Sequence, residues 1–223
     1  ILLKPNGVAT FEFPHLLKLV NENQFDTIYH EHFSYLSLTA LETIFKENGL
    51  QIFDVEEHTT HGGSLRLFAQ RSDTGVQIVS EQVIKLRKRE MDAGMNSDNF
   101  YKNFQEKANI VKDDLLNFLI KAKQDGKKVV AYGAAAKGNT LLNYAGIRPD
   151  LLSYVVDRSP SKQGKYMPGS RIPIHTEQFL KDDKPDYVLI LPWNLKSEVI
   201  KQLSYIKENG GNFVVAVPKL EII

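Results

Sequence analysis

The chain has 223 residues and carries 28 lysine and arginine residues against 27 aspartate and glutamate residues, a formal net charge of +1. This near-neutral balance argues against a broad basic surface, so nucleic acid is not an expected partner. The absence of cysteine excludes disulfide bonds, a thiolate nucleophile and cysteine-based metal sites. No apolar run approaches the roughly 18–20 residues of a membrane span, and the first residues lack a signal-peptide pattern. The composition therefore predicts a globular cytoplasmic protein without a membrane partner.

The N-terminal part, residues 1–72, has the pattern of a strand, a helix and two further strands. The strand over 7–14 is rich in β-forming residues and ends at a proline. Ser37 occupies the N-cap position before apolar residues at helical spacing, and an Asn-Gly pair ends that helix. A short link with two adjacent glycines joins the runs 50–55 and 64–69, which favours an antiparallel pair.

The rest of the chain changes from a helical to an alternating pattern. Apolar residues at helical spacing over 73–125, interrupted at 92–97, predict two helices that act as a connector. Over 126–223, strands that are apolar on both faces alternate with helices, which is typical of a parallel sheet covered by helices. The four expected strands cover 128–132, 153–157, 186–191 and 212–217. We therefore expect an α/β protein whose C-terminal part is a small Rossmann-like domain.

A turn rich in glycine and alanine directly follows the expected strand 128–132. Its small residues would let a ligand approach the backbone, and the free N–H groups at the start of the next helix favour an anion such as phosphate. Neither the dinucleotide pattern G-x-G-x-x-G nor the P-loop pattern is present. The alternative is that these small residues only allow the helix to pack closely on the sheet. The candidates for binding are Gly133, Lys137, Gly138, Asn139 and Thr140.

Two further residues stand at or just after strand ends. Asp157 ends the strand 153–157, where an acidic residue can accept hydrogen bonds from a ribose. It could equally form a turn or cap a helix. Trp193, the only tryptophan, follows the strand 186–191, and a lone tryptophan is more often part of a core or interface than a ligand platform.

The segment Tyr29-His30-Glu31-His32 places four titratable side chains in a row. Such a cluster is costly to bury without partners. His-x-His can supply metal ligands, but no third ligand is in view, so we predict no metal site. General acid–base chemistry fits better, because imidazole titrates near neutral pH and Glu31 or Tyr29 could orient it or protonate an oxyanion. The alternative is an ordinary loop of hydrogen-bonded polar residues.

Five segments, taken in order, resemble those of the S-adenosylmethionine-dependent sugar C-methyltransferases. They are Asp26–Tyr35, His61–Arg66, Tyr132–Thr140, Asp157–Gly164 and Leu191–Asn194. Members of that family add methyl groups to nucleotide-linked deoxysugars. The resemblance spans nearly the whole chain, and five ordered segments are more specific than any one of them.

The resemblance implies a three-part enzyme: an N-terminal zinc-binding domain built on cysteines, a class I methyltransferase domain, and a C-terminal Rossmann-like domain. Because this sequence has no cysteine, we expect the zinc-binding part to be absent. Most of the S-adenosylmethionine site lies early in the class I domain and should be absent too. Residues 1–72 would then be the C-terminal portion of the class I domain. We accordingly expect this chain to be an incomplete and inactive part of a longer enzyme.

The resemblance also implies roles for the candidate residues. His32 would be the general base that removes a proton from the carbon beside the sugar keto group. Tyr29 and Glu31 would orient His32 and stabilise the resulting enolate. His30 would bind the nucleotide-sugar, and S-adenosylmethionine would supply the methyl group. The turn Gly133–Thr140 and Asp157 would either bind the nucleotide-sugar or dock the two domains on each other.

Two other functions are compatible with the sequence. A nicotinamide-dependent oxidoreductase could use the Rossmann-like part, although the missing G-x-G-x-x-G pattern argues against it. A non-catalytic module that binds a nucleotide-sugar would also explain the candidate binding residues. If strands of the class I domain are absent as expected, the apolar surface they leave could drive pairing of two copies of the chain.

Overall fold

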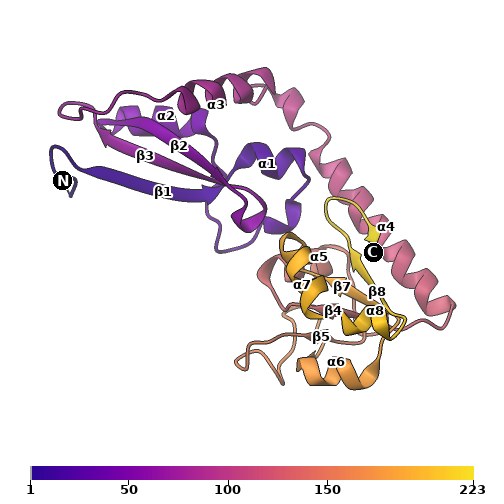
Figure 1. Ribbon diagram of the computed structural model, residues 1–223. Helices are drawn as coiled ribbons and strands as arrows, with labels where there is room; N and C mark the ends of the chain where they lie inside the picture. The colour runs from indigo at the N-terminus through magenta and orange to yellow at the C-terminus, as the bar shows by residue number, and fades with distance from the viewer. Residues whose placement is uncertain (1) are drawn as a thin grey trace. The chain divides into compact units, whose positions relative to one another are not determined.

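A computed structural model describes residues 2–223 of the chain (Figure 1). The chain divides into two compact units, and each is made of stretches that are not continuous in sequence. The first unit combines the chain up to Glu22 with His32–Phe104, and the second combines Asn23–Glu31 with Gln105–Ile223. Of the segment Tyr29-His30-Glu31-His32, the first three residues therefore belong to the second unit and His32 to the first.

The first unit is built on a three-stranded antiparallel sheet of β1 (Val8–Pro14), β2 (Leu50–His58) and β3 (Ser64–Arg71). The predicted strands and the antiparallel β2–β3 pair are confirmed. The strand order is β1-β3-β2, so β3 lies in the middle and pairs with β1 from Val8 opposite Gln70 to Pro14 opposite Ser64. A central place suits β3 because Leu65, Leu67 and Ala69 are fully buried, whereas β1 ends in a proline that cannot donate to a ladder.

Helices α2 (Leu38–Glu47) and α3 (Glu81–Asp92) pack against this sheet. The unit also contains α1 (Leu16–Asn21), η2 (Thr60–Gly62) and η3 (Asp98–Phe100), whereas the short turn η1 (Phe25–Thr27) belongs to the second unit. Ser37 caps α2, because its hydroxyl accepts a 3.1 Å hydrogen bond from the N–H of Ala40. Gly49 follows α2 with a φ of +69°, a conformation that favours glycine. Leu38 and Phe45 of α2 pack with Val83 of α3 in the core of this unit.

A buried acid joins three elements of the first unit. Oε1 of Glu90 in α3 accepts hydrogen bonds from Nε2 of His15 (2.9 Å) and from the N–H of Leu38 (2.8 Å). Its Oε2 accepts from both the N–H and the hydroxyl of Thr39. Burial acts to raise the pKa of Glu90, but the hydrogen bonds from His15 and Thr39 outweigh it and hold that pKa below its ordinary value. The carboxylate also faces the positive end of α2, which favours its charge.

The second unit contains a six-stranded sheet of order β6-β5-β4-β7-β8-β9. Its strands are β4 (Val129–Tyr132), β5 (Val155–Val156), β6 (Ile174–His175), β7 (Tyr187–Ile190), β8 (Asn212–Val215) and β9 (Glu221–Ile222). The pairs from β6 to β8 are parallel and β9 is antiparallel to β8. The four predicted strands are therefore confirmed, as part of a sheet with five parallel strands and one antiparallel strand. The two-residue strands β6 and β9 were not predicted.

Helices on this sheet complete the second unit. They are α4 (Phe104–Gln124), α5 (Ala136–Tyr144), α6 (Glu177–Asp183), η4 (Trp193–Leu195), α7 (Lys196–Gln202) and α8 (Tyr205–Glu208). Val130, Val188 and Phe213 of the sheet pack with Leu180 of α6 and Val199 of α7 in one core. Among residues 2–223, we find no helix with the length and apolarity of a transmembrane span.

The helical stretch expected as a separate connector over 73–125 divides between the two units. Val83 and Leu86 of α3 are part of the core of the first unit. Phe118 of α4 instead packs edge-to-face on Tyr187 of β7, with ring centroids 5.1 Å apart. α3 therefore belongs to the first unit and α4 packs on the sheet of the second.

Candidate functional site

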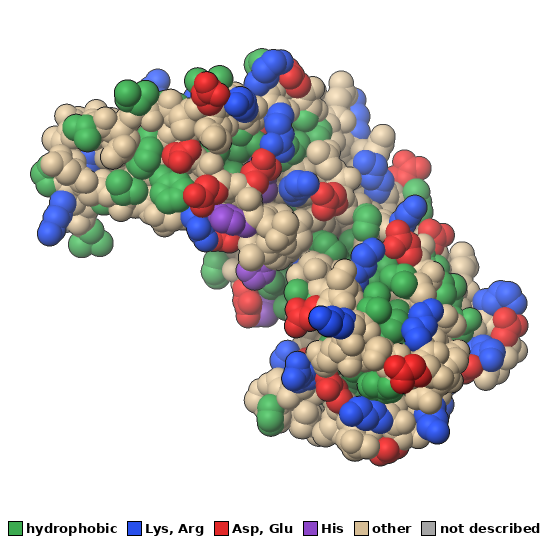
Figure 2. Space-filling model, in the orientation of Figure 1, with side chains coloured by type: hydrophobic (Ala, Val, Ile, Leu, Met, Phe, Trp, Pro, Cys, Tyr) green, Lys and Arg blue, Asp and Glu red, His purple; other side chains and the backbone are tan. Residues whose placement is uncertain are grey.

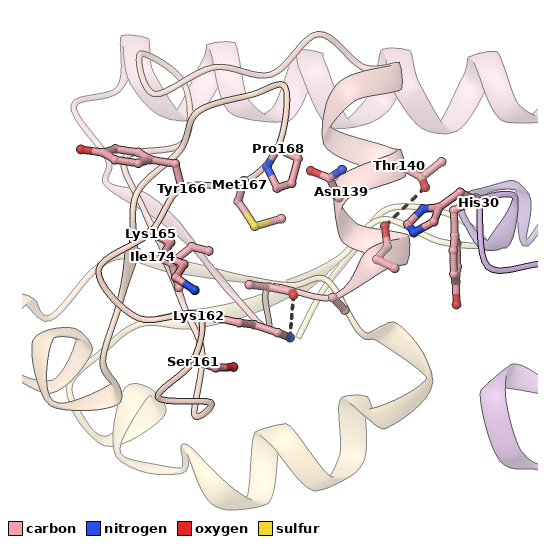
Figure 3. A pocket seen from close by; sticks show the side chains of 14 residues that line it. His30, Asn139, Thr140, Ser161, Lys162, Lys165, Tyr166, Met167, Pro168 and Ile174 are labelled. Carbon is pink, nitrogen blue, oxygen red and sulfur yellow. Dashed lines mark hydrogen bonds between the residues drawn. The ribbon is translucent and has the colours of Figure 1, made fainter.

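A cavity of about 360 Å³ lies beside the turn that follows β4 in the second unit. Residues from three parts of this unit line it: the turn with the start of α5, the connection between β5 and β6, and the short segment from the N-terminal half. Figure 3 shows Asn139 and Thr140 of α5 beside His30, and Lys162 and Lys165 on the β5–β6 connection. Of the residues predicted to bind substrate, His30, Asn139 and Thr140 thus line one cavity.

The β5–β6 connection folds back on itself to form one wall. The N–H of Gly164 donates to the carbonyl of Ile174, and the N–H of Met167 donates to that of Ile172. The side chain of Asn143 in α5 donates a 2.9 Å hydrogen bond to the carbonyl of Pro168. The connection is therefore tied both to β6 and to α5, which gives the cavity a defined wall.

Positive charge gathers at this cavity. Lys165 is exposed, and its ammonium group makes no hydrogen bond or ion pair within residues 2–223. Lys162 donates to the carbonyl of Ala134 (2.8 Å) and lies 3.3 Å from Oδ2 of Asp157. Ala135 stands at the N-cap of α5 and no side chain caps this helix, so no side chain satisfies the first N–H groups of α5.

The amide oxygen of Asn139 is buried and has no hydrogen-bond partner. A buried acceptor without a donor costs about 1–3 kcal/mol. Because Asn139 lines the cavity, an N–H or O–H group of a ligand could supply the missing donor.

The two predicted binding glycines sit where a side chain would not fit. A Cβ on Gly133, whose φ is +89°, would lie 2.6 Å from Cδ of Pro192. A Cβ on Gly138 would lie 2.7 Å from Cβ of Leu191. Both glycines let the turn and α5 approach the end of β7 closely, which is the packing alternative noted from the sequence. Gly138 does not line the 360 Å³ cavity, and Gly133 lines a neighbouring one.

Lys137 points into the unit instead of into the cavity. Its side chain is almost completely buried, and its Nζ donates a 2.8 Å hydrogen bond to Oδ1 of Asn194. The same Nζ lies 4.5 Å from the centroid of the Trp193 ring, a cation–π distance. Burial lowers the pKa of Lys137, and the charge of Asp26 acts in the opposite direction.

Asp26 completes this interior group. Its carboxylate is fully buried, and Oδ2 accepts a 2.7 Å hydrogen bond from Nε1 of Trp193. Burial raises the pKa of Asp26 to about 6, while the Trp193 hydrogen bond and the charge of Lys137 limit the rise. Sequence reasoning missed this role of Asp26, although Asp26, Lys137 and Trp193 each lie in one of the resembling segments.

Asp157 holds the turn that follows β4. Its Oδ2 accepts a 2.8 Å hydrogen bond from the N–H of Ala134, and its Oδ1 accepts one of the same length from the N–H of Ser159. It also lines a second cavity of about 280 Å³ with Gly133, Arg158 and Gln202. These backbone contacts match the turn-forming alternative for this aspartate.

The predicted catalytic residues fall in both units. Tyr29 lines the 360 Å³ cavity and its ring lies 6.4 Å from that of His30. Glu31 is exposed. His32 is half-buried in the first unit, with its ring 6.5 Å from that of Tyr35. The division of the chain falls between Glu31 and His32, so Tyr29 and Glu31 belong to the second unit and His32 to the first.

Comparison with known proteins decides the family. The model of the C-methyltransferase C-terminal domain matches residues 59–218. The chain is 37% identical over 222 residues to C-methyltransferase NovU of Streptomyces niveus, which covers 100% of this chain and 53% of that protein. The chain belongs to the C-methyltransferase family.

Membership of the C-methyltransferase family agrees with the mixed α/β architecture and with the resemblance found in the sequence. The chain spans about half the length of the curated relative that it matches. The family model includes the turn after β4 and both cavity-lining lysines, whereas Tyr29–His32 lie before its first matched residue. Within residues 2–223, no group of three or more histidine, aspartate or glutamate side chains is placed to hold a metal ion.

Proposed function

We propose that the protein transfers a methyl group from S-adenosylmethionine to the carbon beside the keto group of a nucleotide-linked deoxysugar, and that the 360 Å³ cavity binds the nucleotide part of this substrate. Family membership supports the methyl transfer. The observation that carries the substrate site is the cavity itself, which combines Lys162 and Lys165 with the uncapped start of α5.

These groups favour a diphosphate. Lysine ammonium groups and the first N–H groups of a helix both bind phosphate oxygens. Lys165 has no carboxylate partner of its own, and Lys162 shares Asp157 with backbone donors. A diphosphate would therefore enter a site whose positive charge is only partly neutralised.

The remaining lining suits the rest of a nucleotide. Asn139 offers a buried acceptor without a donor, which an N–H of a base or a hydroxyl of a sugar would supply. Met167, Pro168 and Ile174 give apolar surface for a ring. A volume of about 360 Å³ is within the range of roughly 300–1,000 Å³ typical of small-molecule sites.

The proposed chemistry assigns one proton transfer to His32. A proton beside a ketone has a pKa far above 7, so its removal needs an oriented base and stabilisation of the enolate oxygen. His32 would accept this proton, and Tyr29 and Glu31 would orient the base and donate to the enolate oxygen. S-adenosylmethionine would supply the methyl group that the carbon then receives.

The cavity of the second unit does not fit the methyl donor as well as it fits the substrate. The sulfonium centre of S-adenosylmethionine is positive, as are Lys162, Lys165 and the start of α5, so they would repel it. We therefore derive no step through the donor from these residues.

Calorimetric titration of this chain with dTDP, UDP, S-adenosylmethionine and NADH tests the substrate site. We expect dTDP or UDP to bind, and Lys165→Met to weaken the affinity about tenfold, since a charge-assisted hydrogen bond contributes about 1.5–3 kcal/mol. Lys201→Met is the matched control, because Lys201 is an exposed lysine on α7 outside the cavity. Binding of NADH alone would support an oxidoreductase instead. Equal loss in both variants would remove the cavity from the proposal.

A further inference from the structure

The segment Asn23–Glu31 belongs to the second unit without being part of its sheet. Its regular structure is the short η1 turn, so side chains must hold it in place. Two neighbouring residues do so. Phe25 is buried, with its ring 5.3 Å from that of Tyr144 in α5. Asp26 is fully buried and bonded to Trp193.

Asp26, the second residue that holds the segment in place, does so through a directional hydrogen bond in addition to packing. An apolar residue could fill the place of Asp26 without the desolvation cost of a buried carboxylate. The groups that face Asp26 are Lys137 from α5 and Trp193 from the end of β7, and Lys137 is the charged one among them. Trp193 donates through Nε1 to Asp26 while its ring face receives the ammonium group of Lys137. Three elements thus meet at one indole ring.

Asp26 lies just before two cavity residues in the sequence. Tyr29 and His30 follow the η1 turn directly, and both line the cavity in the same unit. In Figure 3, His30 lies next to Thr140 of α5. Any movement of the η1 turn against α5 would therefore move this wall of the cavity.

We propose that Asp26 is a positioning residue, which through Trp193 and Lys137 fixes the η1 turn on α5 and so sets where Tyr29 and His30 lie in the cavity. The effect of Asp26 on substrate binding rests on the proposed function of that cavity. Its effect on where Tyr29 and His30 lie does not depend on that function.

A variant pair separates positioning from general stability. Asp26→Asn keeps the size of the side chain but removes its charge. Asp183→Asn is the matched control in the same unit, because Asp183 also accepts from an aromatic donor, Tyr154, and pairs with a lysine, Lys128, and it does not line the cavity.

Nuclear magnetic resonance on the labelled chain gives the readout. Because Trp193 is the only tryptophan, its indole N–H signal is unique. We expect this signal to titrate with a midpoint near pH 6 in the wild type, and this titration to disappear in Asp26→Asn but not in Asp183→Asn. At one fixed neutral pH, we expect the His30 and Tyr29 signals to differ from the wild type in Asp26→Asn but not in Asp183→Asn. Unchanged His30 and Tyr29 signals in a folded Asp26→Asn protein would overturn the proposal.

Trp193→Phe provides a second route if Asp26→Asn does not fold, since it removes the indole donor to Asp26 while keeping an aromatic ring, and it should also shift the His30 and Tyr29 signals. A titration with dTDP then links the positioning to binding. We expect about tenfold weaker binding in Asp26→Asn and unchanged binding in Asp183→Asn. If the wild type binds neither dTDP nor UDP, the proposed substrate site fails, while the signals of His30 and Tyr29 still decide the positioning role.

Discussion

Nε1 of Trp193 donates a 2.7 Å hydrogen bond to Oδ2 of Asp26, although 167 positions separate the two residues in the sequence. This contact joins the η1 turn, which precedes Tyr29 and His30, to the residues that follow β7 inside one unit. It brings together segments that the sequence could identify only separately. It also involves the fully buried carboxylate of Asp26, whose pKa burial raises.

The first prediction concerns the pH dependence that Asp26 confers. Its pKa is raised in the folded state, so the native protein holds this proton more tightly than the unfolded chain does. The resulting stabilisation is complete below the ordinary pKa of 3.8 and is lost as the pH rises through about 6. The difference between 3.8 and about 6 corresponds to about 3 kcal/mol of unfolding free energy.

Urea unfolding of the wild type and of Asp26→Asn between pH 4 and 7 measures this effect. We expect the variant to gain stability relative to the wild type as the pH rises. Asp183→Asn should keep a nearly constant difference from the wild type over this range, because the hydrogen bonds from Lys128 and Tyr154 outweigh burial and lower the pKa of Asp183 from its ordinary 3.8, so its pH-dependent effect lies below pH 4. A stability difference between wild type and Asp26→Asn that stays constant with pH would contradict the prediction.

The second prediction concerns the steric role of Gly133. Alanine at this position places Cβ 2.6 Å from Cδ of Pro192 and requires a φ of +89°. We expect Gly133→Ala to lower the unfolding free energy by about 2–4 kcal/mol, from backbone strain and overpacking together. Gly210→Ala is the control, because Gly210 has a similar φ of +84° with nothing near its Cβ. Equal losses in the two variants would show that packing against Pro192 contributes nothing.

The third prediction concerns the buried acid of the first unit. Glu90→Gln keeps the shape of the side chain but removes a charge that accepts from His15, Leu38 and Thr39. We expect a loss of about 2 kcal/mol or more in unfolding free energy, since hydrogen bonds to charged groups contribute about 1.5–3 kcal/mol each.

Glu57→Gln is the control for Glu90→Gln. Glu57 pairs with Arg89 at the surface, where its side chain is 40% exposed, so its loss should cost no more than about 1 kcal/mol. Chemical unfolding of both variants at neutral pH measures the two costs. A Glu90→Gln protein as stable as Glu57→Gln would show that the buried cluster is not a stabilising one.

The fourth prediction concerns the proposed base and applies to the full-length enzyme. His32→Asn should lower kcat for methyl transfer by about 10²–10⁴, the usual contribution of a general base, with little change in substrate affinity. His58→Asn serves as control, because His58 is a partly exposed histidine of β2 whose partner is Glu56. Steady-state kinetics with a nucleotide-linked keto-sugar give both constants. Near-normal turnover in His32→Asn would remove His32 from the mechanism.

Local signals made much of the fold predictable. Ser37 and Gly49 mark the ends of α2 because capping and a positive φ depend on neighbouring residues alone. The buried strands of the second unit were predictable because strands covered on both faces are apolar throughout. The central position of β3 was not predictable in the same way, since pairing with β1 depends on residues far apart in the sequence.

The site was predictable in part for a related reason. Asn139 and Thr140 line the cavity as the residue types at a strand-to-helix turn suggest. Lys137 has the same local context, yet it turns inward because Asn194, Trp193 and Asp26 surround it. None of these three neighbours is close to Lys137 in sequence, so no local pattern distinguishes a buried lysine from a ligand-binding one. On the face drawn in Figure 2, basic and acidic side chains are interspersed, in keeping with the nearly neutral sequence.

The discontinuous composition of the second unit constrains how this protein can be made and divided. During synthesis, residues 23–31 leave the ribosome long before α5 and Trp193 do. They can therefore pack in the second unit only after most of the chain has been made. A piece that begins at Gln105 would contain the whole six-stranded sheet but would leave Tyr144 and Trp193 without Phe25 and Asp26. Expressing the C-terminal unit faithfully therefore requires two stretches of polypeptide, supplied together or joined by a linker.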